Sequence, residues 1–130
     1  MVLDASLALA YVMPDEDSSA ASTLLVRIEE GPVLAPTIWI YEIASALRMG
    51  QVRSRLTSEM AESVLTTLAE LHVEFENPNG HQLMRLSHQT GLTVYDASYI
   101  ALCLKHQLPL ASLDRRLVRA ARDLGIVVLT

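Results

Sequence analysis

The sequence is poor in several residue types: it contains one cysteine, one lysine, one tryptophan and one phenylalanine, and no long hydrophobic run. The single thiol of Cys103 cannot form an internal disulfide, so we expect a reducing, cytoplasmic environment. Because the four histidines are scattered and Cys103 has no partner at ligand spacing, a zinc site is not expected. No apolar stretch approaches the roughly 20 residues that span a bilayer. Asp4 interrupts the first apolar run, so we expect neither a membrane span nor a signal peptide.

The length and composition predict one globular domain over residues 1–130. Hydrophobic residues make up 51% of the chain, which is enough to build a core. The net charge of −5 gives no general indication of nucleic-acid binding. Four of the ten basic residues nevertheless lie in "DRRLVRAAR": Arg115, Arg116, Arg119 and Arg122.

Short apolar segments alternate with helical patterns along the chain. We expect strands within residues 1–4, 33–36, 73–76, 109–112 and 126–129. We expect helices within residues 5–13, 15–31, 37–50, 56–72, 79–91, 94–107 and 114–125. Thr57 is a candidate N-cap, and Met60, Val64, Leu68 and Leu71 form the apolar stripe of that helix. This alternation predicts an α/β fold in three layers, with a central, mainly parallel sheet of four to five short strands between helices.

Four acidic residues stand out against this pattern. Asp4 ends the first expected strand and Asp114 follows the fourth, so both should lie at the carboxyl-end rim of the sheet. Asp96 opens a helix, and Glu42 lies in a helix that is apolar nearly all round, so it should face inward. Each aspartate also suits a helix N-cap, but a glutamate in the middle of a helix has no capping role.

If these four carboxylates converge, their repulsion must be relieved. Either some of them are protonated with raised pKa values, or a divalent cation lies between them. An oxygen-only set of donors suits Mg²⁺ or Mn²⁺. Carboxylate-held Mg²⁺ is a common setting for phosphodiester hydrolysis.

Four segments in order carry a resemblance that covers essentially the whole chain. They are "VLDAS", "YEIASAL", "LTVYDASYIALC" and "PLASLDRRL". With them the chain resembles the PIN-domain family, in particular the VapC-type ribonuclease toxins of toxin–antitoxin pairs. The resemblance implies an endoribonuclease with one or two Mg²⁺ or Mn²⁺ ions in an acidic pocket, an antitoxin whose tail covers that pocket, and a homodimer.

The resemblance also implies roles for individual residues. Asp4, Asp96 and Asp114 hold the metal, and Glu42 either holds it or orients the attacking water. Ser112 stands where threonine is common, and Ser6 matches a small polar position. Both serines could hydrogen-bond the acids, or could serve only as turn or cap residues. Ser45 stands where the family often has asparagine.

The basic helix allows two interpretations. Arg115, Arg119 and Arg122 recur at i, i+4 and i+7, so they share one face that could bind RNA phosphates near the acids. The alternative is a solvated face opposite Leu117 and Ala121.

Rival functions fit less well. A response-regulator receiver needs paired acids after the first strand and a late lysine, whereas Asp4 stands alone and Lys105 lies within a helix. A haloacid-dehalogenase-type enzyme needs a second aspartate where this chain has Ser6. A housekeeping nuclease, or an idle PIN-fold module that binds RNA or docks a protein, remains the alternative.

Overall fold

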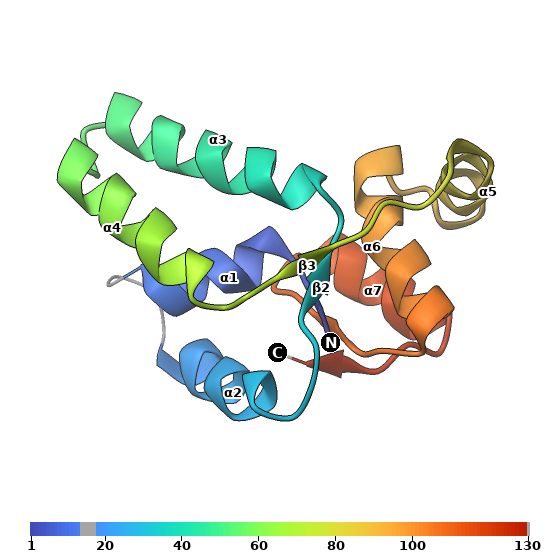
Figure 1. Ribbon diagram of the computed structural model, residues 1–130. Coiled ribbons are helices and arrows are strands. Elements are labelled where there is room, and N and C mark those ends of the chain that lie inside the picture. Colours follow the sequence, from blue (N-terminus) through green and yellow to red (C-terminus); the bar gives the residue numbers. More distant parts are fainter. Residues whose placement is uncertain (14–17, 130) are drawn as a thin grey trace.

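The computed structural model describes residues 1–13 and 18–129, in which five short strands alternate with seven helices (Figure 1). The strands are β1 Val2–Leu3, β2 Leu34–Ala35, β3 Glu74–Phe75, β4 Leu110–Ala111 and β5 Val128–Leu129. The helices are α1 Ala5–Val12, α2 Ser18–Ile28, α3 Ile38–Val52, α4 Ser58–Ala69, α5 Gly80–Thr90, α6 Val94–His106 and α7 Arg115–Asp123. Every strand lies within its predicted segment. The start of the helix predicted over residues 15–31 lies outside the described residues.

The strands form one sheet in the order β3-β2-β1-β4-β5, and all neighbouring pairs are parallel. The predicted fold class is therefore confirmed. Residues of β1 and β4 are fully buried, as expected for the central strands of a parallel sheet. Because β1 and β4 are neighbours, the residues that follow them lie side by side at one rim of the sheet.

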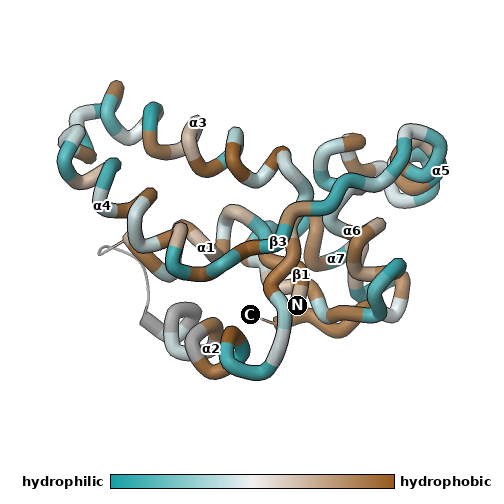
Figure 2. The backbone as a smooth tube through the Cα atoms, in the orientation of Figure 1, coloured by the Kyte–Doolittle hydropathy of each residue, from teal (hydrophilic) through white to brown (hydrophobic). Residues whose placement is uncertain are grey.

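Helices cover both faces of the sheet. Figure 1 shows α1–α4 on one side of the sheet and α5–α7 on the other. Helix α6 packs against β1, β2 and β4, and its residues Ala97–Cys103 are all buried. In Figure 2, the residues of the central strands are coloured hydrophobic, whereas α5 and the α3–α4 turn contain hydrophilic stretches. Within the described residues, no helix is both long and apolar enough to cross a membrane.

Two details of the α3–α4 hairpin differ from the prediction. Helix α3 does not end near Gly50 but continues to Val52. A Cβ atom on Gly50 would lie 2.8 Å from Leu56 Cδ1, so the missing side chain lets Leu56 pack closely against the helix. In α4, Thr57 is the N-cap as predicted, but Met60 is exposed and Ala61 takes its place in the buried stripe.

The start of α3 is held by a side chain from another part of the chain. Thr37 precedes the helix without capping it through its own side chain. Instead, Asn77 Oδ1 accepts hydrogen bonds from Thr37 N at 3.0 Å and from Thr37 Oγ1 at 2.9 Å. The loop after β3 thus fixes the helix that carries Glu42.

Candidate active site

Asp4 lies directly after β1 and is 5% exposed. Its N–H donates to Ala111 O at 2.9 Å, which continues the pairing with β4 by one residue. Its carboxylate caps α1, because Oδ2 accepts from Ser6 N at 3.3 Å. Within the described chain, no hydrogen bond is seen to its other oxygen, Oδ1.

Asp114 lies three residues beyond the end of β4, directly before α7. It caps α7 through Oδ1, which accepts from Arg116 N at 2.8 Å and from Leu117 N at 2.9 Å. Its Oδ2 makes no hydrogen bond to the described residues. The capping interpretation is therefore confirmed for Asp4 and for Asp114. In each case it uses one carboxylate oxygen and leaves the other for a ligand.

Asp96 does not cap its helix, so that interpretation is wrong. Helix α6 begins two residues earlier, at Val94, and its N-cap is Thr93, whose Oγ1 accepts from Asp96 N at 3.1 Å. The Asp96 side chain is half-buried in the first turn of α6. Because Thr93 satisfies the end of the helix, the carboxylate has no capping role.

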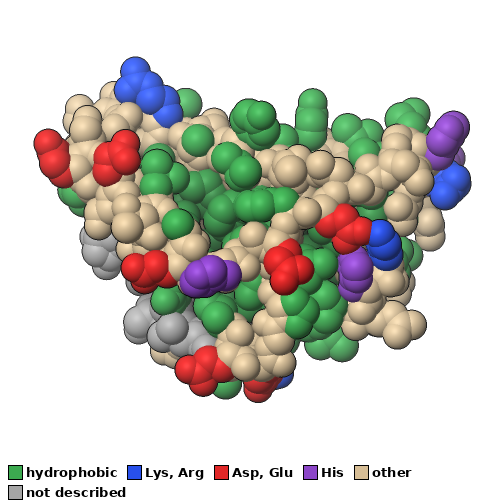
Figure 3. All heavy atoms as spheres, in the orientation of Figure 1, with side chains coloured by type: hydrophobic (Ala, Val, Ile, Leu, Met, Phe, Trp, Pro, Cys, Tyr) green, Lys and Arg blue, Asp and Glu red, His purple; other side chains and the backbone are tan. Residues whose placement is uncertain are grey.

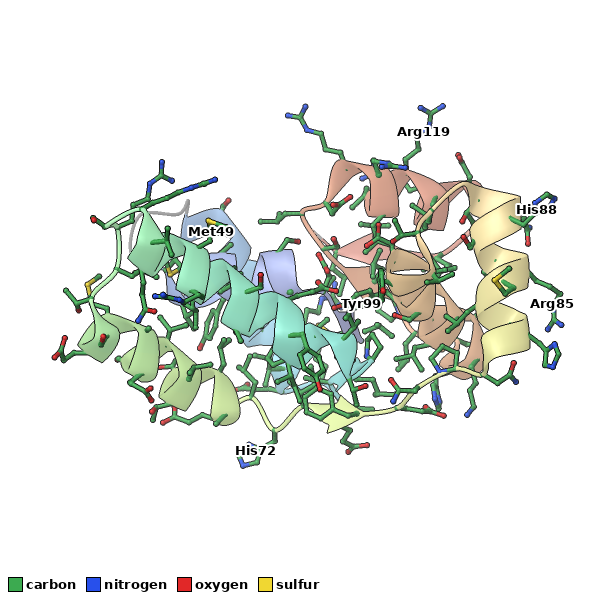
Figure 4. The ribbon with its side chains drawn as sticks, turned by 90° about the horizontal axis from the view of Figure 1, so that it is seen from above. Met49, His72, Arg85, His88, Tyr99 and Arg119 are labelled. Atoms are coloured by element: carbon green, nitrogen blue, oxygen red, sulfur yellow. The ribbon has the colours of Figure 1, made fainter. Side chains whose placement is uncertain are left out.

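Glu42 reaches the same rim from α3, and its side chain is half-buried rather than fully inward. The hydroxyl of Tyr99, from α6, donates to Glu42 Oε2 at 3.4 Å. Figure 4 shows Tyr99 between α6 and α3, and the phenol is fully buried. Tyr99 therefore connects the helix that carries Asp96 to the helix that carries Glu42.

The four acids interact electrostatically. Burial raises the pKa of Glu42 to about 7, and the negative charges of Asp4, Asp96 and Asp114 add to the rise. The hydrogen bond from Tyr99 acts in the opposite direction and lowers this pKa. Burial also raises the pKa of Asp96, and the negative charges of Asp114 and Asp4 add to that rise. The hydrogen bond from Thr93 and the positive charge of Arg116 oppose that second rise. Acids from four separate elements are thus close enough to disfavour one another's ionisation.

Two serines organise the buried acid. The Ser112 hydroxyl is fully buried and donates to Asp4 Oδ2 at 2.7 Å. The same oxygen of Ser112 accepts from Asp114 N at 3.0 Å, so one side chain connects two of the acids. Ser6 also donates to Asp4 Oδ2, and its hydroxyl accepts from Leu113 N at 3.0 Å.

The donor set fits a hard divalent cation, because it offers only carboxylate and hydroxyl oxygens and its acids repel one another. In this conformation, no three Asp, Glu, His or Cys side chains of residues 1–13 and 18–129 lie close enough to hold an ion. Holding one would therefore require the carboxylates to rotate toward each other. Asp96 and Glu42 are only half-buried, which leaves room for that movement.

The other predicted residues are the arginines of α7, Cys103 and the histidines. Arg115, Arg119 and Arg122 are exposed on α7. Cys103 is buried in α6, and burial raises its pKa to about 12, so it is an inert core residue. None of the four histidines lies among the acids, and His106 pairs instead with Glu76.

Sequence reasoning missed two residues of this region. Tyr99 was counted as part of an apolar helix, although a buried tyrosine hydroxyl needs a partner and it lies one turn after Asp96. Arg116 is not one of the three arginines that recur at i, i+4 and i+7, yet it is the one that acts on Asp96. Its position two residues after Asp114, within the capped first turn of α7, was the available signal.

Comparison with known proteins identifies the family of the chain. The family model described as PIN domain matches residues 1–123. The chain belongs to the PIN domain family. Ribonuclease VapC3 of Pyrobaculum aerophilum is 32% identical to this PIN domain over 121 residues, covering 90% of this chain and 91% of that protein.

Solved structures support the assignment of the PIN fold. PAE2754 from Pyrobaculum aerophilum superimposes with a TM-score of 0.75 at 25% identity, covering 98% of this chain and 88% of that one. FitAcB from Neisseria gonorrhoeae gives a TM-score of 0.65 at 17% identity, covering 99% and 96%. At that identity the second likeness shows the fold alone.

Proposed function

We propose that this PIN-domain protein is a metal-dependent endoribonuclease and the toxin of a toxin–antitoxin pair. The observation that carries the proposal is the meeting of Asp4, Glu42, Asp96 and Asp114, where burial and then mutual repulsion raise the pKa values of Glu42 and Asp96. The relative named Ribonuclease VapC3, similar over nine-tenths of the chain, supports the same activity. PIN nucleases generally use divalent metal ions.

In this proposal Asp4, Asp96, Asp114 and Glu42 would hold Mg²⁺ or Mn²⁺. When bound, such an ion lowers the pKa of water and stabilises the negative charge that develops on a phosphoryl oxygen. Ser112 and Ser6 fix the Asp4 carboxylate through its Oδ2. In the metal-free site, burial and the neighbouring carboxylates raise the pKa of Glu42 to about 7, and a bound cation would relieve this repulsion.

RNA would approach past α7. Its exposed arginines Arg115, Arg119 and Arg122 supply positive charge near Asp114, on a protein that is otherwise acidic. Phosphate contacts of this kind position a strand without reading its sequence, and they weaken as salt rises. Replacing these arginines should therefore flatten the salt dependence of RNA binding.

Two protein partners complete the proposal. VapC-type toxins act with a cognate antitoxin, and the acidic rim suits an antitoxin tail that offers an arginine. A homodimer is supported by α3, which exposes Ile40, Tyr41, Met49 and Val52. In α6, the apolar residues Tyr99–Cys103 are buried within the chain, whereas Tyr95 and Leu104 are exposed.

The direct test is cleavage of a mixed RNA pool by purified protein. We expect cleavage with Mg²⁺ or Mn²⁺, none with EDTA, and at least about a hundredfold loss in Asp4→Asn and Asp96→Asn, since each change removes a negatively charged ligand. Glu62→Gln, an exposed acid on α4, is the matched control and should retain full activity. Cleavage that survives EDTA or both asparagine variants would refute the proposal.

A further inference from the structure

A pocket of about 310 Å³ lies between α7 and the turn that joins α5 to α6. The turn contributes Thr90, Gly91 and Leu92, and α7 contributes Arg116, Arg119, Ala120 and Asp123. We call it the arginine pocket. Its lining includes Leu92, just before α6 with Asp96 in its first turn, and Arg116, in the first turn of α7 that Asp114 caps.

Positive charge is concentrated in this pocket. Arg116 and Arg119 are three residues apart, so they lie on the same side of α7. Both are exposed, and neither forms an ion pair with a carboxylate of the described residues. Asp123 is the single acid among the lining residues, so the pocket carries a net positive charge.

Backbone atoms complete the pocket. The Arg116 guanidinium donates to Gly91 O at 3.4 Å, which holds its head against the turn. Gly91 caps α5 with a φ of +71°, a conformation that favours glycine, and nothing lies within 4 Å of where its Cβ would be. The turn therefore leaves open space beside the guanidinium.

An RNA strand that crosses the acid site meets strong negative charge on one side. Phosphates flanking the bond to be cleaved need a cationic partner to offset that repulsion. A guanidinium binds phosphate oxygens directly through paired N–H groups. It therefore offsets the repulsion on one particular phosphate better than dispersed positive charge does. Arg116 is placed for it, because it lies close enough to Asp96 to interact with it electrostatically.

We propose that the arginine pocket binds a backbone phosphate of the RNA next to the scissile phosphate. The inference rests on the proposed nuclease function and adds a positioning role for Arg116 and Arg119. Their contacts fix which linkage reaches the acids. Arg115 and Arg122 do not line the pocket and contribute only general attraction.

The test uses a short single-stranded RNA that the wild type cleaves at one linkage. A single uncharged methylphosphonate linkage, built on a 2′-O-methyl sugar, is moved along the strand, and a strand with the 2′-O-methyl sugar alone serves as reference. Steady-state kcat and KM are measured for the wild type, Arg116→Gln, Arg119→Gln and the double variant. Arg85→Gln is the matched control, because Arg85 lies exposed on α5 and points away from the site (Figure 4).

For the wild type we expect KM to rise about tenfold at one linkage beside the cleaved bond, with kcat little changed, since one charge-assisted phosphate contact is lost. The double variant should show a similar rise in KM on unmodified RNA, and the methylphosphonate at that linkage should have no further effect. Arg85→Gln should behave as the wild type. A thermal denaturation curve for each variant checks that it is folded.

Two results would overturn the inference in distinguishable ways. If the double variant and Arg85→Gln respond alike to every methylphosphonate position while cleavage persists, the pocket holds no phosphate. If the wild type cleaves no RNA with Mg²⁺ or Mn²⁺, the proposed function itself is wrong, and the inference fails with it.

Discussion

At the scale of single residues, Asp4 and Asp114 show how one side chain can serve folding and chemistry together. Each uses one carboxylate oxygen to cap a helix, through hydrogen bonds to N–H groups of the first turn. The second oxygen of each makes no hydrogen bond within the described chain. Capping therefore orients the free oxygen, and the two roles that the sequence left as alternatives are compatible.

Glu42 should give the metal-free protein a measurable pH dependence of stability. Its pKa in the folded protein is about 7, against an ordinary value of 4.5. Its protonated form is favoured by folding, so this contribution is complete below about pH 4.5 and is lost as pH rises through 7. Between pH 5 and 8 we expect the free energy of unfolding in EDTA to fall by roughly 1 kcal/mol from this group, after allowing for solvent screening.

The measurement is urea denaturation at both pH values. Glu42→Gln should reduce the fall, and the control Glu62→Gln should keep it. If the free energy of unfolding of Glu42→Gln falls between pH 5 and 8 as much as that of the wild type, folding does not raise the pKa of this carboxyl.

At the scale of elements, the acids reach the rim because helices start there. Helix α1 begins just after β1 and α7 begins after the short segment that follows β4, while α6 begins after a short turn and carries Asp96 in its first turn. Helix α3 differs, because its start is capped from the loop after β3 by Asn77. The position of Glu42 therefore depends on a residue 35 positions later in the chain.

Asn77→Ala should lower the free energy of unfolding by about 1 kcal/mol, because the helix N–H and the Thr37 hydroxyl both lose their acceptor. Chemical denaturation at constant pH measures the change. Gln89→Ala, an exposed position on α5, is the control and should lie within about 0.5 kcal/mol of the wild type. If Asn77→Ala is as stable as the wild type, Asn77 does not stabilise the start of α3.

The order and type of the elements could be predicted, because alternating apolar runs and helical periods are local signals. The cap of α6 was misassigned, since Thr93 and Asp96 both suit a helix start and only the geometry decides between them. Likewise, the contact between Gly50 of α3 and Leu56 of the loop before α4 has no local signature. The hydrogen bond from Tyr99 to Glu42 could not be predicted, because it depends on how α3 and α6 pack.

At the scale of the whole molecule, α3 presents more apolar surface than the chain itself covers. Figure 3 shows hydrophobic side chains along the outer edge over α3 and in the hollow between α3, α4 and β3. The hollow is lined by Trp39 and Phe75, whose ring centroids are 5.9 Å apart. Trp39 itself is buried and belongs to the core of the chain.

Self-association through α3 predicts a mass near twice 14.3 kDa in sedimentation velocity at micromolar concentration. Met49→Arg should shift the protein toward monomer, because it places a charge on the exposed apolar edge of α3. Met84→Arg makes the same change on α5, at a residue that is 67% exposed, and should leave the mass unchanged. A wild type that sediments as a monomer would contradict the dimer.

Mn²⁺ titration by calorimetry tests whether the four carboxylates from four elements form one metal site. We predict that the wild type binds Mn²⁺, and that Asp4→Asn, Glu42→Gln, Asp96→Asn and Asp114→Asn each weaken binding by about tenfold or more. Glu62→Gln should bind as the wild type does. Absence of Mn²⁺ binding, or binding that none of the four substitutions weakens, would contradict the account.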